Sequence, residues 1–243
     1  MATAPSDFQE VGTLLERFTK ISPETKEMYS DEIAINNKRK PFEEWQKDFG
    51  VPFRSRGCTF LNYDAKTPEQ RAALEVAQHL ASELCSASRR EIRPRIFCGT
   101  PGTGKTHLAC AAIGVALRFG KVSRYMTASD IARSVRSSYS KGADRTEEVI
   151  IAQNVAVPFL VIDEIGVGLG SAHETAMIHD TITKRYEAMA PTLLISNLSQ
   201  KALADYLGER ILDRFREDNA QTVEFAWASN RREMMREKMG AER

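Results

Sequence analysis

The segment from residue 99 to residue 106 constrains the fold more than any other part of this sequence. It reads Gly-Thr-Pro-Gly-Thr-Gly-Lys-Thr and fits the pattern GxxxxGK[ST]. The apolar run Ile96–Cys98 precedes it, and a helical pattern over residues 107–119 follows it. A glycine-rich turn that matches by chance would not require both neighbours. The segment therefore predicts a phosphate-binding loop between a buried strand and a helix, as in α/β nucleotide-binding proteins.

The side chains of this loop predict a site for ATP and Mg²⁺. Lys105 is expected to contact the β- and γ-phosphates, and Thr106 to ligate Mg²⁺. The other positions are expected to surround the phosphates with backbone N–H groups, and they are Gly99, Thr100, Pro101, Gly102, Thr103 and Gly104.

Two acidic residues follow a second apolar run, Phe159–Ile162. Because adjacent side chains of a strand point to opposite faces, Asp163 and Glu164 can perform different tasks. We expect Asp163 to hold Mg²⁺ and Glu164 to orient and polarise the attacking water. Two solvated acids at a strand end are the alternative, but the phosphate loop upstream favours the magnesium site. A second acid also favours hydrolysis over phosphate transfer to a small acceptor. A nucleoside kinase would need an arginine-rich lid, and no such segment is evident in the sequence.

The remaining sequence predicts an α/β fold with a parallel β-sheet between two layers of helices. A long helix is expected over residues 68–88. Further helical stretches are expected between short runs with strand character, which cover residues 95–98, 122–126, 159–162, 192–196 and 222–225.

Residues 1–57 predict a small helical N-terminal domain with a linker, and residues 58–243 the nucleotide-binding domain. In the first part, a helix that begins at Pro41 places three aromatic residues on one face, namely Phe42, Trp45 and Phe49. This stripe is either a partner-binding face or an internal core. Pro52, Gly57 and the arginines between them are typical of a linker, which sets the boundary.

Four further residues are candidates for catalysis. Asn197 follows the apolar run 192–196 and could contact the attacking water, although Asn there could also cap the next helix. Arg210 and Arg214 lie four residues apart, so they share a helix face. Either could reach the γ-phosphate of a neighbouring subunit as an arginine finger, or form ion pairs on a solvated surface. Arg231, beyond the last strand, is a candidate for contacting the nucleotide.

The motifs, in this order, resemble the DnaC/DnaI-type bacterial or phage replicative helicase loaders of the AAA+ ATPase superfamily. The resemblance covers roughly residues 58 to 232 and is carried by TFLNY, PGTGKTHLA, FLVIDEIG, SNL, LGERILDR and FAWASNR. It departs from the family at SNR, where SYR is usual, and in the glycine-rich stretch after Gly166. In this family Asn197 and Arg231 match the sensor 1 and sensor 2 positions.

The resemblance implies an ATPase that acts as a switch. Such loaders bind a hexameric replicative DNA helicase through the N-terminal domain, self-assemble through their ATP sites, engage single-stranded DNA and release the helicase upon hydrolysis. Trp45-Gln46-Lys47 resembles the helicase-binding region of the loaders. An IstB-type transposition helper ATPase shares nearly all of these motifs, and an adaptor that binds nucleotide but barely hydrolyses it is a third possibility.

Candidate DNA contacts lie between the second and third strands. Cations can follow a phosphate backbone and an aromatic ring can stack on a base. The segment 129–141 offers Arg133, Arg136, Tyr139 and Lys141, and the loop beyond the acidic pair offers Ser171 and His173. A solvated helix face explains the same pattern equally well.

Composition narrows the setting. A net charge of +1 supplies no global field that attracts nucleic acid, so any DNA site must be a local basic patch. The four cysteines form no CxxC pair, which predicts free thiols and no zinc site. Without an apolar run of membrane-spanning length or a leader-like N-terminus, we expect a cytoplasmic protein with no membrane partner.

Overall fold

The computed structural model describes residues 46–139, 145–166 and 172–229. Its centre is a five-stranded parallel sheet in the order β2-β3-β4-β1-β5. The strands are β1 (Arg95–Gly99), β2 (Ser123–Thr127), β3 (Phe159–Ile165), β4 (Thr192–Ser196) and β5 (Gln221–Phe225). Because all strands run in one direction, their carboxyl ends meet at a single edge.

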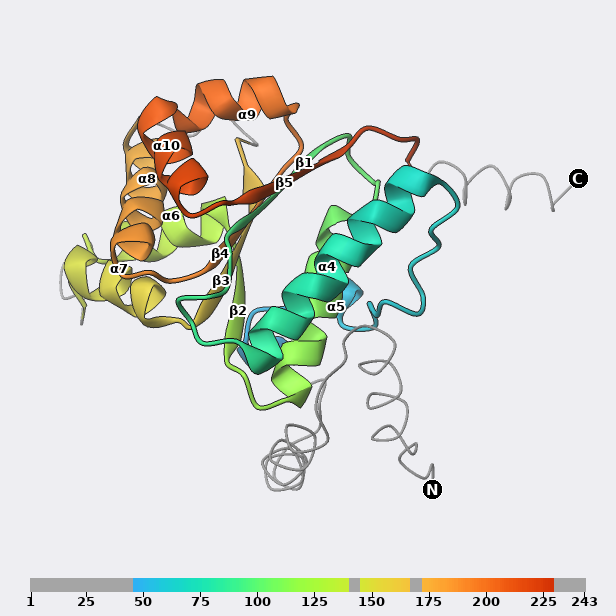
Figure 1. The fold of residues 1–243 in the computed structure, drawn as a ribbon. Helices are drawn as coiled ribbons and strands as arrows, with labels where there is room; N and C mark the ends of the chain where they lie inside the picture. The colour runs from blue at the N-terminus through green and yellow to red at the C-terminus, as the bar shows by residue number, and fades with distance from the viewer. Residues whose placement is uncertain (1–45, 140–144, 167–171, 230–243) are drawn as a thin grey trace, which may run out of the picture.

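Helices cover both faces of this sheet (Figure 1). One face carries α4 (Pro68–Ser86) and α5 (Lys105–Arg118). The other carries α6 (Ala128–Ser137), α7 (Glu147–Ala156), α8 (Ala172–Glu187), α9 (Gln200–Leu207) and α10 (Glu209–Glu217). A short 3₁₀ helix, η1 (Phe53–Ser55), lies beside α5. The three layers form the AAA+ P-loop fold that the sequence predicted.

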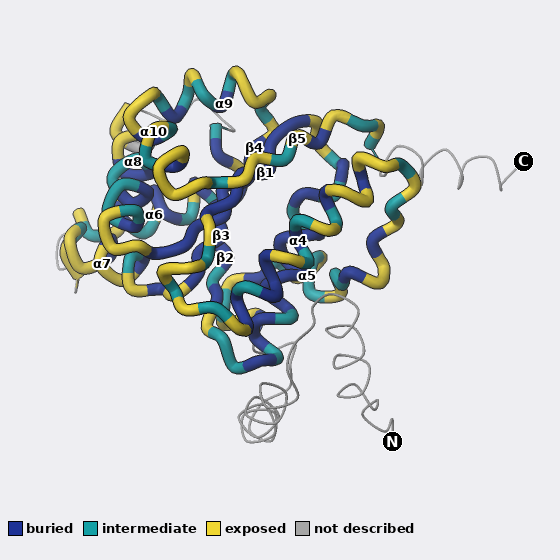
Figure 2. Tube along the Cα trace, viewed as in Figure 1, coloured by how far each residue is buried: buried dark blue, intermediate teal, exposed yellow. Residues whose placement is uncertain are grey.

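The central strands each contain a continuous apolar run because both faces of the sheet are buried there. In β3, Phe159 and Val161 contribute to the core beneath α4 and α5, whereas Leu160 and Ile162 contribute to the core on the opposite face. Burial on both faces requires this continuous hydrophobic run in place of alternation. Figure 2 shows the central strands buried between helices whose outer surfaces are exposed, whereas the edge strand β5 is largely exposed.

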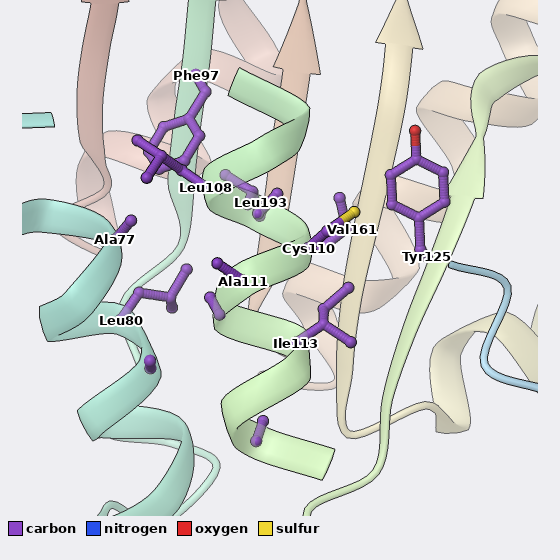
Figure 3. Close-up of a cluster of buried hydrophobic side chains, with 14 of the residues drawn as sticks. Ala77, Leu80, Phe97, Leu108, Cys110, Ala111, Ile113, Tyr125, Val161 and Leu193 are labelled. Carbon is purple, nitrogen blue, oxygen red and sulfur yellow. The ribbon is translucent and has the colours of Figure 1, made fainter. Parts of the chain in front are cut away.

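Helix α5 packs tightly between the sheet and α4. Ten of its 14 residues are buried, and small residues such as Ala111 and Ala112 allow the close approach. Leu108 and Ile113 fill the space toward the strands (Figure 3). The N-terminus of α5 is thereby fixed at the carboxyl edge of the sheet.

The segment that the sequence suggested as a linker is packed against this core. Val51 is 1% exposed and belongs to the core cluster beneath α4 and α5, against which Phe49 also packs. The N–H of Tyr125 in β2 donates to the carbonyl oxygen of Phe49 at 2.8 Å. A free connector would make no such contacts. The boundary at residue 57 stays a prediction, but residues 46–57 form part of the surface of the α/β unit.

The expected elements agree with the structure to within a few residues. Helix α4 ends two residues before the predicted end, and the strand 192–196 matches β4 at both ends. Strand β3 differs most, since it continues to Ile165 through the acidic pair. No helix of the described residues is long and apolar enough to span a membrane. The four cysteines are free thiols.

Candidate nucleotide-binding site

The phosphate loop joins β1 to α5 at the carboxyl edge of the sheet, and two glycines determine its path. Gly99 has φ +109°, and a Cβ there would lie 2.7 Å from the carbonyl oxygen of Phe225. Gly104 has φ +100°, and a Cβ there would lie 2.5 Å from the Tyr63 ring. Both positions combine a left-handed backbone with no room for a side chain, so they require glycine.

Side chains outside the motif hold the loop from two sides. The Trp227 indole N–H donates to the carbonyl oxygen of Thr103 at 3.1 Å, and the Tyr63 hydroxyl donates to the same oxygen at 3.4 Å. The Thr103 hydroxyl donates to the Thr100 carbonyl oxygen at 2.7 Å. These three hydrogen bonds therefore hold the phosphate loop in its conformation.

Lys105 is buried at the first position of α5, with only 4% of its surface exposed. Its ammonium donates to the carbonyl oxygens of Gly99 at 2.8 Å and Thr100 at 2.7 Å. Burial lowers the pKa of Lys105 to about 8, and the nearby Asp163 carboxylate opposes part of that shift. Phosphate oxygens would be stronger partners than neutral carbonyl oxygens, so the buried cation is prepared for an anionic ligand.

Asp163 lies opposite the loop and accepts three hydrogen bonds. Its Oδ2 accepts from the Thr106 hydroxyl and from the Tyr125 hydroxyl, each at 2.7 Å, and its Oδ1 accepts from the Glu164 N–H at 2.6 Å. The side chain is 5% exposed. The structure thus unites the two residues that the sequence assigned to Mg²⁺, and their oxygens are the hard donors that this ion prefers.

Glu164 has an unusual backbone. Its φ is +61°, which is rare for a residue with a side chain, and the pairing of β3 with β4 shifts register between Ile162 and Ile165. The shift leaves Asp163 buried while Glu164 is exposed beside it. A left-handed glutamate costs on the order of 1–3 kcal/mol and is typical of functional sites.

The neighbouring strand places Asn197 at the same edge. Asn197 directly follows β4 and is exposed. The buried Ser196 hydroxyl donates to the Ile165 carbonyl oxygen at 2.6 Å and accepts from the Leu198 N–H at 3.1 Å. Ser196 therefore fixes the ends of β3 and β4 relative to each other. The cap of α9 is supplied by Ser199, whose hydroxyl accepts from the Ala202 N–H at 3.3 Å, so Asn197 is not the cap.

Arg210 and Arg214 lie one turn apart on α10. Arg214 forms an ion pair with Glu187 at 3.2 Å, and its guanidinium lies 5.1 Å from the centre of the Tyr186 ring. Glu187 ends α8, five residues before β4 begins, so Arg214 lies toward the amino ends of the strands and far from the loop of its own chain. Arg210 is exposed, whereas the Arg214 side chain is 17% exposed.

The candidate DNA residues fall into two groups. Tyr139 and His173, from separate elements, lie together: the Tyr139 hydroxyl is 3.3 Å from His173 Nε2 and also contacts Glu147. Arg133 and Arg136 are exposed on α6, and Arg133 pairs with Asp130 at 3.6 Å. The other two DNA candidates, Lys141 and Ser171, lie outside the described residues. So do the nucleotide candidate Arg231 and two residues of the aromatic stripe, Phe42 and Trp45. Phe49 packs against the core and is partly buried.

Sequence reasoning missed three residues that shape the site: Tyr125, Tyr63 and Trp227. Tyr125 points toward the carboxyl end of the neighbouring strand (Figure 3), where it meets Asp163. Burial, followed by the Asp163 charge, raises the pKa of Tyr125, so the phenol remains a donor. Tyr125 was visible as a polar residue within the predicted strand 122–126, but the sequence could not show that this strand lies beside β3. Tyr63 and Trp227 stood only as parts of a family pattern.

The fold and this geometry define the class: an AAA+ P-loop protein with a candidate nucleotide site at the junction of β1 and α5. The chain belongs to the IstB-like ATP-binding protein family, whose model matches residues 63–237.

Curated relatives agree with this family and with the predicted resemblance. The replicative helicase loader DnaC of Buchnera aphidicola subsp. Schizaphis graminum is 31% identical over 202 residues, which cover 83% of this chain and 80% of that protein. DnaC of Escherichia coli K12 is 33% identical over 182 residues, which cover 75% of this chain and 72% of that protein.

Solved structures confirm the fold. The DnaC helicase loader superposes with a TM-score of 0.61 and 23% identity over 71% of this chain and 99% of that one. DnaI superposes with a TM-score of 0.58 and 19% identity over 76% of this chain and 98% of that one. AMPPCP-bound DnaA from Aquifex aeolicus also has a TM-score of 0.58, with 23% identity over 79% of this chain and 56% of that one.

Proposed function

We propose that this protein loads a ring-shaped replicative DNA helicase onto single-stranded DNA, with ATP binding and hydrolysis as the switch. The observation that carries this proposal is the identity of 31–33% to helicase loaders over 72–80% of their length. It is supported by a complete set of P-loop side chains in one place: Lys105, Thr106, Asp163 and Glu164.

In the proposed switch, ATP arrives with Mg²⁺ at the phosphate loop. Lys105 exchanges its two carbonyl partners for β- and γ-phosphate oxygens. Thr106 and Asp163 would hold Mg²⁺, which would supply positive charge to offset the charge that develops on the phosphates. Glu164 is exposed beside Asp163 and orients a water for attack on the γ-phosphate, and Asn197 contacts that water or the phosphate from the next strand.

The proposed helicase contact lies in residues 1–57, with Phe42 and Trp45 as its centre. A pulldown with full-length protein tests it against two partners, a hexameric replicative helicase and an IstB-associated transposase. The proposal predicts capture of the helicase and its loss in Trp45→Ala. Capture of the transposase alone would support a transposition helper, an alternative that the name of the matching family model favours. Any truncation should begin before Gln46, since Val51 is part of the core.

The proposed assembly places Arg210 or Arg214 at the γ-phosphate of a neighbouring subunit. Arg214 pairs with Glu187 at the end of α8, away from the phosphate loop of its own chain, and Arg210 is the more accessible of the two. Loss of an arginine finger costs about 10³–10⁵ in rate.

A mixing experiment tests the shared site. Arg210→Ala and Arg214→Ala should each bind ATP, and the variant that lacks the finger should hydrolyse it poorly. Adding Lys105→Ala subunits, which still supply both arginines, should restore turnover at mixed interfaces. No recovery for either arginine variant, with assembly intact, would contradict a shared site and leave both arginines as surface ion-pair residues.

The proposed single-stranded DNA contact uses Tyr139 and His173, whose rings lie 5.8 Å apart on the outer helical layer. An exposed ring is worth about 1–3 kcal/mol per stacked base. Tyr139→Ala should therefore weaken binding of oligothymidylate by roughly tenfold or more in fluorescence anisotropy. ATP turnover measured with and without this DNA separates a loader from an adaptor with little hydrolysis.

A further inference from the structure

A cavity lies between α6, α7 and the edge strand β2, apart from the phosphate loop. Its volume is about 270 Å³, and Met126 and Ile150 form part of its wall. Arg124, which also lines it, pairs with Leu160 in β3, whereas Thr127 pairs with Asp163. Three residues of strand correspond to about 10 Å. Arg124 therefore lies about 10 Å nearer the amino ends of the strands than Asp163, and the cavity lies on the sheet face opposite α5.

Polar side chains of all three elements line this cavity. Arg124 of β2 and Arg145, just before α7, supply guanidinium groups, whereas the α6 residues Ser134 and Ser137 donate their hydroxyls to the carbonyl oxygens of Ile131 at 2.8 Å and Ser134 at 2.6 Å. Arg145 is held in place by a hydrogen bond to the Gln153 side chain at 3.1 Å. Within the described part of the chain, the residues that line the cavity carry two positive charges and no carboxylate.

One of these donors is buried without a partner. Asn154 is 3% exposed and lines the cavity, and its Nδ2 makes no hydrogen bond within residues 46–139, 145–166 and 172–229. The backbone at this position is fixed, because the buried Arg185 guanidinium donates to the Asn154 carbonyl oxygen at 2.6 Å. A buried amide with no partner costs roughly 1–3 kcal/mol. The Nδ2 atom has almost no exposed surface, so an acceptor atom in the cavity would remove this cost only once the amide turns toward it.

From this arrangement we propose that the cavity binds a phosphate group and that the protein therefore has a second anion site beside its nucleotide site. Phosphate offers three or four acceptor oxygens to donors that approach from several sides, whereas a carboxylate offers only two. Arginine is the side chain best matched to phosphate, through two parallel N–H donors. The volume suits a phosphate ester more than a whole nucleoside triphosphate.

The test is an NMR titration of the full-length chain carrying Lys105→Ala, which removes the principal cation of the phosphate loop. Inorganic phosphate should shift the backbone amides of Ser134 and Gln153 to saturation. In Arg124→Ala/Arg145→Ala the apparent affinity should fall by about tenfold or more. The matched control Arg54→Ala/Arg71→Ala removes two exposed arginines elsewhere and should titrate like the parent.

A second arm distinguishes the source of the phosphate. If oligothymidylate without terminal phosphates shifts the same amides and competes with inorganic phosphate, the site takes the backbone of single-stranded DNA. If only inorganic phosphate or AMP shifts them, the site takes a free phosphate ester. Should the double variant fail to fold, Arg145→Gln, at an exposed position, carries the test. No shift with any probe, or a titration unchanged by loss of the arginines, would overturn the proposal.

Discussion

Removing the Tyr125 hydroxyl should loosen the magnesium-binding edge of the site. The phenol donates to Asp163 Oδ2 at 2.7 Å in a buried setting. A hydrogen bond to a charged group is worth about 1.5–3 kcal/mol, so Tyr125→Phe should lower the free energy of unfolding by about that amount. For a chain of this length, the change corresponds to a fall in Tm of roughly 3–10 °C. The Mg²⁺ requirement for ATP binding should rise as well, because Asp163 loses one of the groups that orient it.

Thermal unfolding in a double-mutant cycle with Asp163→Ala measures the coupling directly. Tyr63→Phe serves as the matched control, because that hydroxyl donates to a neutral carbonyl oxygen at 3.4 Å and should contribute less. A coupling energy below about 0.5 kcal/mol between Tyr125 and Asp163 would refute the reasoning, since the two side chains would then act independently.

Three further predictions concern the same site. Glu164→Gln should retain ATP yet lower turnover by about 10²–10⁴, as measured by phosphate release, and normal turnover would place the activating group elsewhere. Gly104→Ala should cost on the order of 1–3 kcal/mol from the backbone alone. It should also displace Tyr63, which thermal unfolding and ATP titration would detect, and an unchanged Tm would refute the requirement for glycine. Burial lowers the pKa of Lys105 to about 8 from 10.5, so the folded state binds fewer protons and the free energy of unfolding should rise between these pH values. ATP affinity should fall as pH rises through 8, and Lys105→Met should lose the rise in stability.

The sequence predicted the parts of the fold that depend on local pattern. The strand 192–196 and the helix from Pro68 are both confirmed, and the structure shows a capping box of Thr67 and Gln70 at the start of that helix. The end of β3 was placed too early, because two acids normally end a buried strand. In the structure the buried Asp163 carboxylate accepts three hydrogen bonds, which stabilise the charge inside the protein and allow the strand to continue.

The site was predictable to the extent that its residues belong to a contiguous motif. Lys105 and Thr106 are recognisable from spacing alone, and the pairing of Thr106 with Asp163 follows from the shared carboxyl edge. The order of strands in the sheet is not encoded locally, so the place of Tyr125 beside Asp163 could not be derived. The same limit applies to Arg214. Helical spacing suggested it as a candidate arginine finger but could not predict its contacts with Glu187 and the Tyr186 ring.

Helicase loading on a circular single strand tests the central claim most directly. The substrate has no free end, so a ring-shaped helicase can encircle it only if the ring is opened. If this protein is a loader, adding it with ATP and Mg²⁺ should increase the amount of helicase that remains on the circle after a high-salt wash. Lys105→Ala, whose phosphate loop is disabled, should not increase that amount. Equal retention of helicase with the wild type, with Lys105→Ala and with no added protein would contradict the proposed loading function.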